Sequence, residues 1–80
     1  MGLRTGNQLK AARALASLNQ EQLAVRSGVN VNTIRNMEAR GAEILVSGLD
    51  TVSKVQSALE TAGVVFIPEN GGGAGVRLKK

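Results

Sequence analysis

The stretch that most constrains the fold runs from residue 20 to residue 38 and reads QEQLAVRSGVNVNTIRNME. Leu23 gives its first half an inward apolar position, and Ile34 and Met37 repeat at helical spacing in its second half. Gly28 stands between the two halves, where a helix can end in a left-handed residue that glycine adopts without strain. We therefore predict two short helices joined by a tight turn, which is helix-turn-helix spacing.

The second of these predicted helices, residues 31–39, has a polar face opposite its apolar one. Asparagine amides pair with adenine through two hydrogen bonds, and the arginine fork fits guanine O6 and N7. A solvated helix face is also polar, but two asparagines and one arginine on one face favour base readout. Thr33 fits a phosphate contact and a packing role equally well. The predicted base contacts are Val31, Asn32, Arg35 and Asn36.

This stretch resembles a known family. The segments NQEQLAVRSGVNVNTIRNMEARG and QLKAARALASL, within residues 5–41, are similar to the lambda-repressor-like, xenobiotic-response-element (XRE) family of helix-turn-helix regulators. The later segment TVSKVQSALETAGVVFIPENGGGAGVRL is similar to the tail of a bacterial subgroup of small XRE proteins. The resemblance implies a mainly α fold: a four-helix lambda-repressor-like helix-turn-helix domain, residues 1–63, followed by a C-terminal β-hairpin, residues 64–80.

The resemblance also implies roles for single residues. It suggests that Arg13 pairs with Glu38 and so ties the first helix to the third, and that Gln20 contacts a phosphate at the start of the second helix. The alternative for Gln20 is a solvated side chain beside a helix cap. On the DNA-binding hypothesis, Thr33 and Arg40 would also hold phosphates.

Capping patterns place the remaining helices. The pair Thr5 and Gln8 predicts a helix over residues 6–17, and the pair Asn19 and Gln22 predicts one over residues 20–27. Residues 1–4 are expected to be a loose end. Asn30 is the predicted cap of the helix over residues 31–39. The pair Ser47 and Asp50 predicts a fourth helix over residues 49–62.

Two predicted strands follow, residues 64–67 and 76–80, with a loop over residues 70–75. The loop does not match a phosphate-binding loop, because no helix and no Gly-Lys-Ser/Thr ending follow its glycines. A lone hairpin is marginal in water, so we expect it to pair with a second copy of the chain; folding back on the fourth helix of its own chain is the alternative. The expected dimerisation residues are Val64, Val65, Phe66, Ile67, Val76 and Leu78.

Composition narrows the function. Eighty residues suit one small domain, and the lack of cysteine and histidine excludes disulfides, the usual zinc sites and histidine chemistry. We expect no cofactor and no enzymatic activity. No apolar run is long enough to span a membrane, so a cytoplasmic location is expected. Residues 1–41 hold six basic and two acidic side chains, whereas residues 42–80 hold four of each, and the basic half suits duplex DNA.

Two functions remain open at this stage. The first is a sequence-specific transcriptional repressor that binds a palindromic operator in double-stranded DNA as a homodimer, with half-sites about 10 base pairs apart. The second is an antitoxin-like or antiactivator module of the same fold that covers a protein partner with its hairpin.

Overall fold

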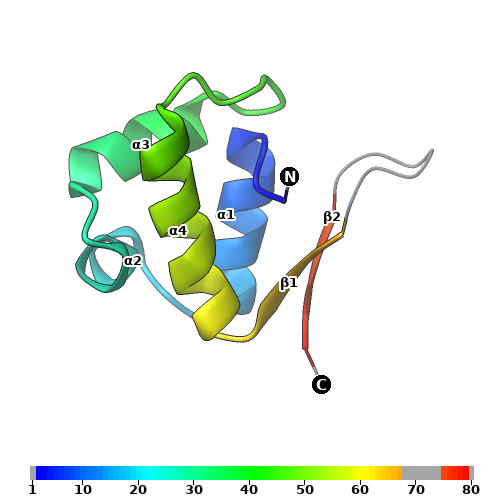
Figure 1. The fold of residues 1–80 in the computed structure, drawn as a ribbon. Helices are drawn as coiled ribbons and strands as arrows, with labels where there is room; N and C mark the ends of the chain where they lie inside the picture. Colours follow the sequence, from blue (N-terminus) through cyan, green and yellow to red (C-terminus); the bar gives the residue numbers. More distant parts are fainter. Residues whose placement is uncertain (1, 68–74, 80) are drawn as a thin grey trace.

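Four helices and a two-stranded antiparallel hairpin make up the part of the chain that the computed structural model describes, residues 2–67 and 75–79 (Figure 1). The prediction of a mainly helical fold with a C-terminal hairpin is confirmed. The elements are α1 (Gly6–Leu15), α2 (Gln20–Ser27), α3 (Val31–Ala39), α4 (Leu49–Thr61), β1 (Val64–Ile67) and β2 (Gly75–Leu78).

The first three helices begin at the predicted caps. The Thr5 hydroxyl accepts a hydrogen bond from the Gln8 amide at 3.1 Å, and Asn19 caps α2 in the same reciprocal way. Asn30 accepts from the Asn32 amide at 2.8 Å. Side chains at these caps satisfy amides that have no partner within the helix. The helix α1 ends at Leu15, two residues before the predicted end, because the chain turns at Ala16 and then takes a left-handed conformation.

The predicted cap of α4 is wrong. Gly48 precedes the helix, and no side chain caps it. With Gly48 at the cap, Asp50 is the second residue of the helix, one position before the third position that a capping box uses, and its carboxylate lies 3.5 Å from the Lys54 ammonium one turn later. The other end of α4 is as the sequence indicates, because Ala62 closes the helix and Gly63 follows with a φ of +100°.

The N-terminal residues are packed, and the prediction of a loose end is wrong for residues 2–4. Leu3 is 1% exposed and belongs to the core. Its amide donates to the Gln56 side chain at 2.9 Å, and the Arg4 carbonyl accepts from the Leu45 amide at 2.7 Å. The apolar side chain of Leu3 therefore anchors the segment.

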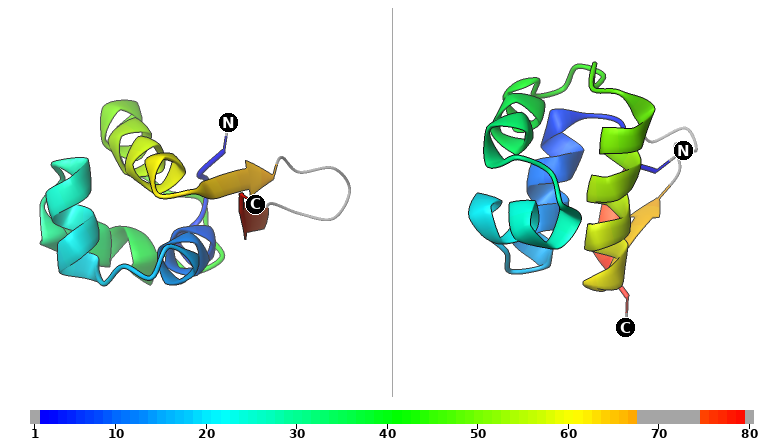
Figure 2. Two further views of the ribbon diagram at one scale, coloured as in Figure 1. Left: turned by 90° about the horizontal axis from the view of Figure 1, so that it is seen from below. Right: turned by 60° about the vertical axis from the view of Figure 1, so that its left-hand side comes forward.

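One core joins all of the helices to the hairpin. The helices α2 and α3 lie on one side of the α1 and α4 pair, and the hairpin lies on the other side (Figures 1 and 2). The strand β1 contacts α4, and β2 contacts α1. The buried apolar residues are Leu3, Leu9, Ala12, Leu18, Leu23, Ile34, Met37, Val52, Val55, Leu59 and Val64.

The hairpin folds back on its own helices, which was the alternative left open by the sequence. Its register places Val64 opposite Leu78 and Phe66 opposite Val76. Val64 is only 2% exposed, so its expected role as a surface residue for dimerisation is wrong in this conformation. The second strand begins at Gly75, one residue earlier than predicted. Positions 70–74 of the predicted loop, and position 80, lie outside the described residues.

Candidate nucleic-acid interface

The helix α3 has one buried and one exposed face. Ile34 and Met37 belong to the core, whereas Asn32, Arg35 and Asn36 are exposed. The apolar side chains fix the rotation of the helix about its axis, because turning it would move them into water. The three polar predicted base contacts therefore share an accessible surface. Val31 and Thr33 lie at its margin and are half-buried.

The Arg35 guanidinium is held by three acceptors. Its Nη1 donates to Asn32 Oδ1 at 3.1 Å within α3. Two further bonds reach α2, from Nε to Gln20 Oε1 at 3.3 Å and from Nη2 to Glu21 Oε2 at 3.2 Å. The guanidinium is thus fixed between α3 and the first turn of α2, although the Arg35 side chain is 47% exposed.

Gln20 links this surface to the interior. Its Oε1 accepts from Arg35, and its Nε2 donates to Glu38 Oε1 at 3.1 Å. Both ends of the amide therefore have protein partners, so the predicted phosphate contact would require the side chain to give up one of them. The backbone amides of Gln20 and Glu21, in the first turn of α2, have no intrahelical acceptor and point outward from the helix end.

A buried ion pair lies beneath Gln20. Arg13 Nε is 2.6 Å from Glu38 Oε2, and Arg13 Nη2 is 3.0 Å from Glu38 Oε1. Arg13 Nη1 also donates to the Leu18 carbonyl at 3.0 Å. The hydrogen bond to Glu38 raises the pKa of the Arg13 guanidinium above its ordinary value, against the lowering effect of burial. This pair holds α1 against the C-terminal end of α3.

The structure places Arg40 at the end of α3, apart from the exposed asparagines. Its Nε and Nη2 donate to the Ile44 carbonyl at 3.2 and 3.1 Å, and Nη2 lies 3.4 Å from Glu43 Oε1. In this conformation, the guanidinium secures the connector between α3 and α4. The predicted phosphate contact of Arg40 would have to compete with these bonds.

A polar hollow of about 500 Å³ lies where α1, α2 and α3 meet. It opens over the chain of contacts that runs from Arg13 through Glu38 and Gln20 to Arg35. Two arginines, one carboxylate and one neutral amide make up this chain, and Glu21 adds a second carboxylate, so the hollow is not a uniformly basic surface. The residues that line this hollow are Lys10, Arg13, Asn19, Gln20, Glu21, Arg35, Glu38 and Ala39.

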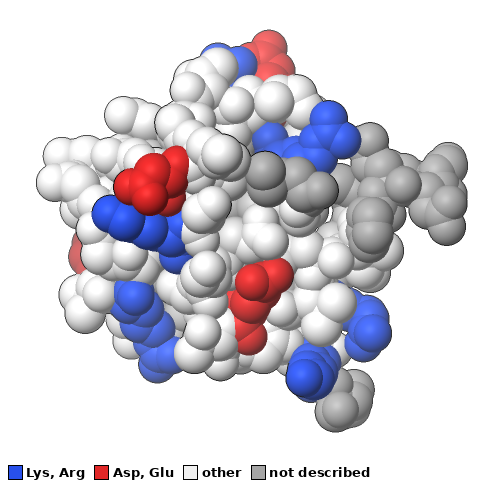
Figure 3. Space-filling model, in the orientation of Figure 1, with Lys and Arg blue, Asp and Glu red and all other residues white. Residues whose placement is uncertain are grey.

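On the α4 side of the molecule, lysine and arginine also lie among acidic residues (Figure 3).

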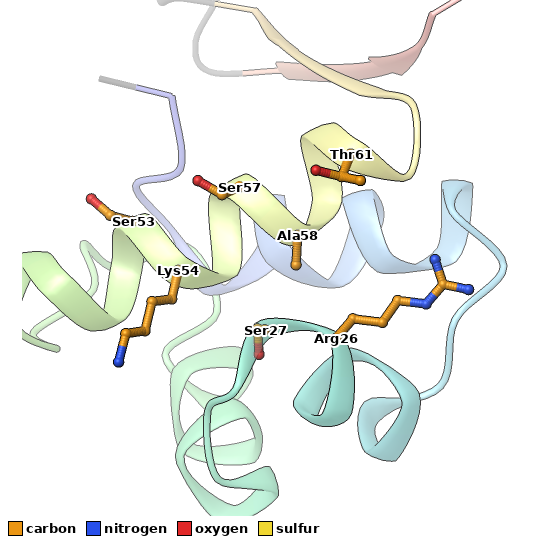
Figure 4. A pocket seen from close by; sticks show the side chains of 7 residues that line it. All are labelled: Arg26, Ser27, Ser53, Lys54, Ser57, Ala58 and Thr61. Carbon is orange, nitrogen blue, oxygen red and sulfur yellow. The ribbon is translucent and has the colours of Figure 1, made fainter.

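A second hollow, of about 610 Å³, lies between α2 and α4 (Figure 4). Its basic residues are Arg26 and Lys54, and hydroxyl side chains surround them. Figure 4 shows the charged ends of these two side chains pointing away from each other, so they do not converge on one anion. Within residues 2–67 and 75–79, no group of three or more acidic, histidine or cysteine side chains could hold a metal ion.

Glu21 is the site residue that the sequence analysis did not identify. It lies in the first turn of α2, where a carboxylate is common because it interacts favourably with the helix dipole. The only hint of its contact with Arg35 is that α2 and α3 cross near this turn. Val25 is an exposed apolar residue that lines a third hollow together with Glu21 and Val31, and no pattern in the sequence indicated it.

None of the helices described here is long and apolar enough to cross a membrane. No protein-family model matches the chain, and no curated protein is significantly similar to it in sequence.

Proposed function

We propose that the protein is a sequence-specific regulator of the lambda-repressor-like, XRE type that reads double-stranded DNA with α3. The observation that supports this most is the exposed surface of Asn32, Arg35 and Asn36 on a helix whose opposite face is fixed by the core. An α-helix fits the major groove, and these side chain types are the ones that recognise adenine and guanine there.

In the proposed complex, the α2–turn–α3 unit acts as a helix-turn-helix. Arg35 donates to guanine, Asn32 and Asn36 pair with adenine, and Val31 meets a thymine methyl. The outward amides of the first turn of α2 bind a backbone phosphate, and Thr33 and Arg40 bind others. These phosphate contacts set the depth and angle of α3, while the base contacts carry the sequence preference.

We further propose that the protein acts as a homodimeric repressor on a palindromic operator. The exposed side chains of Ile67 and Leu78 lie on the hairpin, next to the half-buried Val65, Phe66 and Val76. A second copy that covers these residues would remove apolar surface from water. A two-fold axis through the pair would place two α3 helices about one turn of DNA apart.

Selection of bound sequences from random duplexes tests the proposal. The wild-type protein should enrich a motif with two related half-sites. Arg35→Ala should lose about 1–3 kcal/mol on that motif and relax preference at one base pair in each half-site. Lys54→Ala is the control, because it removes an exposed basic side chain from α4, outside α3 and the hairpin, and should leave the base preference unchanged. Absence of any enriched motif for the wild type would refute sequence-specific readout.

A protein-binding module is the second candidate, and a specific surface favours it. Ile44, Val46 and Leu49 are exposed large apolar side chains on the connector after α3 and at the start of α4. An antitoxin-like or antiactivator protein would cover such side chains with its partner. Sedimentation of the purified protein separates the candidates: a stable homodimer that binds a defined duplex supports the regulator, and a monomer without DNA affinity supports the module.

A further inference from the structure

The contact between Glu21 and Arg35 puts a carboxylate within the surface proposed to meet DNA. Glu21 Oε2 lies 3.2 Å from Arg35 Nη2, and both side chains are exposed, at 67% and 47%. Glu21 comes from the first turn of α2, next to the amides that would bind a phosphate. A negative charge at this place opposes binding of any polyanion, so its presence calls for a physical explanation.

Charge pairing changes what Arg35 can recognise. A free guanidinium binds phosphate strongly, since both the charge and the geometry fit. With Glu21 beside it, the net charge of the pair is zero, and the carboxylate repels an approaching phosphate, which offsets part of the attraction to the guanidinium. A guanidinium has five N–H groups, and three of them donate to Asn32, Gln20 and Glu21, which leaves two for other acceptors.

Neutral acceptors are affected differently. Guanine O6 and N7 carry no net charge, so the carboxylate does not repel them as it repels a phosphate, and they can accept from the remaining N–H groups. The pair therefore weakens contacts that any DNA sequence offers while keeping those that only guanine offers. Specificity arises as a difference between affinities, and a charge placed against the wrong ligand increases that difference.

We propose that Glu21 is a specificity-determining residue: by pairing with Arg35 it suppresses phosphate binding at α3 and reserves the guanidinium for a base edge. This inference rests on the proposed DNA-binding function. Glu21 acts through Arg35 as a positioning residue and does not itself contact a base. Stabilisation of the α2 helix dipole by Glu21 is compatible with this role but predicts no change in base preference.

Glu21→Gln tests the proposal against the motif selected by the wild-type protein and against a scrambled duplex of equal length. Affinity for the scrambled duplex should rise roughly twofold to fivefold, the range for an exposed charge pair. The slope of log K against log salt should steepen by about 0.9, as for one additional phosphate contact. Affinity for the motif should rise less, so the ratio of the two affinities should fall.

Three further variants test whether the effect of Glu21→Gln arises from the charge of Glu21 beside Arg35. Glu21→Asp keeps the charge and should retain most of the wild-type ratio between the affinities for the motif and for the scrambled duplex. Glu60→Gln removes the same charge from an exposed position on α4 and should leave the ratio unchanged. In an Arg35→Ala background, Glu21→Gln should no longer alter the preference for guanine over other bases.

Failure of the proposed DNA-binding function can be distinguished from failure of the proposed role of Glu21. A wild-type protein that selects no motif refutes the proposed function itself. A wild-type protein that selects a motif, together with a Glu21→Gln variant whose affinity ratio and salt slope equal those of the wild type, overturns only the role of Glu21. Thermal unfolding of each variant shows that the compared proteins are folded at the assay temperature.

Discussion

Replacing Glu38 by alanine should be one of the most damaging single changes in the protein. Its carboxylate makes a two-point contact with Arg13, at 2.6 and 3.0 Å, and accepts a third bond from Gln20 at 3.1 Å. The Glu38 side chain is 4% exposed and that of Arg13 is 19% exposed. Removing the carboxylate leaves a largely buried guanidinium that, among residues 2–67 and 75–79, keeps the Leu18 carbonyl as its one hydrogen-bond partner.

The expected cost follows from this partial burial. Breaking a fully buried pair costs about 3–5 kcal/mol and an exposed pair about 0–1 kcal/mol, so Glu38→Ala should cost about 2–4 kcal/mol. A domain of 80 residues has a stability of roughly 4–12 kcal/mol. At about 4–8 °C per kcal/mol, the melting temperature should fall by roughly 8–32 °C.

Urea and thermal unfolding, followed by far-ultraviolet circular dichroism, measure this cost. Glu43→Ala is the control, since Glu43 is the exposed partner of Arg40 at 3.4 Å and its loss should cost under about 1 kcal/mol. Replacing both members of the buried pair with apolar residues, Arg13→Met with Glu38→Leu, should cost less than Glu38→Ala alone. Equal costs for Glu38→Ala and Glu43→Ala would refute the assignment of a structural role to the buried pair.

Three further predictions concern packing and pH. Gly6→Ala should lower the free energy of unfolding in urea by at least about 1–3 kcal/mol, because the added Cβ would lie 2.5 Å from the Met37 carbonyl oxygen of α3. The control Gly48→Ala adds a Cβ in open space and should lower it by less than about 1 kcal/mol. Leu3→Ala should cost about 2–5 kcal/mol, and a loss below about 0.5 kcal/mol would contradict the packed N-terminal segment. Because the pKa of Arg13 is raised, its contribution to stability is complete below the unfolded-state pKa and is lost only as the pH rises through the folded-state pKa. The difference in unfolding free energy between wild type and Arg13→Met, measured by urea titration at several pH values, should therefore stay constant from about pH 6 to pH 10. A steady slope of this difference in that range would contradict the prediction.

Local signals in the sequence predicted the helices well. Thr5, Asn19 and Asn30 start the first three helices because their side chains bond to nearby amides, an interaction that depends only on neighbouring residues. Gly28 ends α2 with a φ of +71°, a left-handed conformation that glycine adopts without strain and that also depends on local residues alone. The exposed face of α3 also followed from helical periodicity alone, since Ile34 and Met37 had to face the core.

Long-range contacts were harder to predict. Leu3 belongs to a core that residues far along the chain complete, and its amide donates to the Gln56 side chain. The hairpin finds cover on α1 and α4, which no local pattern specifies. Glu21 meets Arg35 across the turn because two helices cross there, and that contact depends on a crossing geometry that residue spacing alone does not fix.

The most direct test of DNA readout by α3 is a nuclear magnetic resonance titration of the labelled protein with the selected duplex. The Arg35 Nε–H signal, the side-chain amides of Asn32 and Asn36, and the first-turn amides of α2 should show the largest shifts, and those of β1 and β2 smaller ones. Shifts confined to the hairpin and to the exposed apolar residues of the connector, with α3 unchanged, would contradict the proposal that this helix enters the groove.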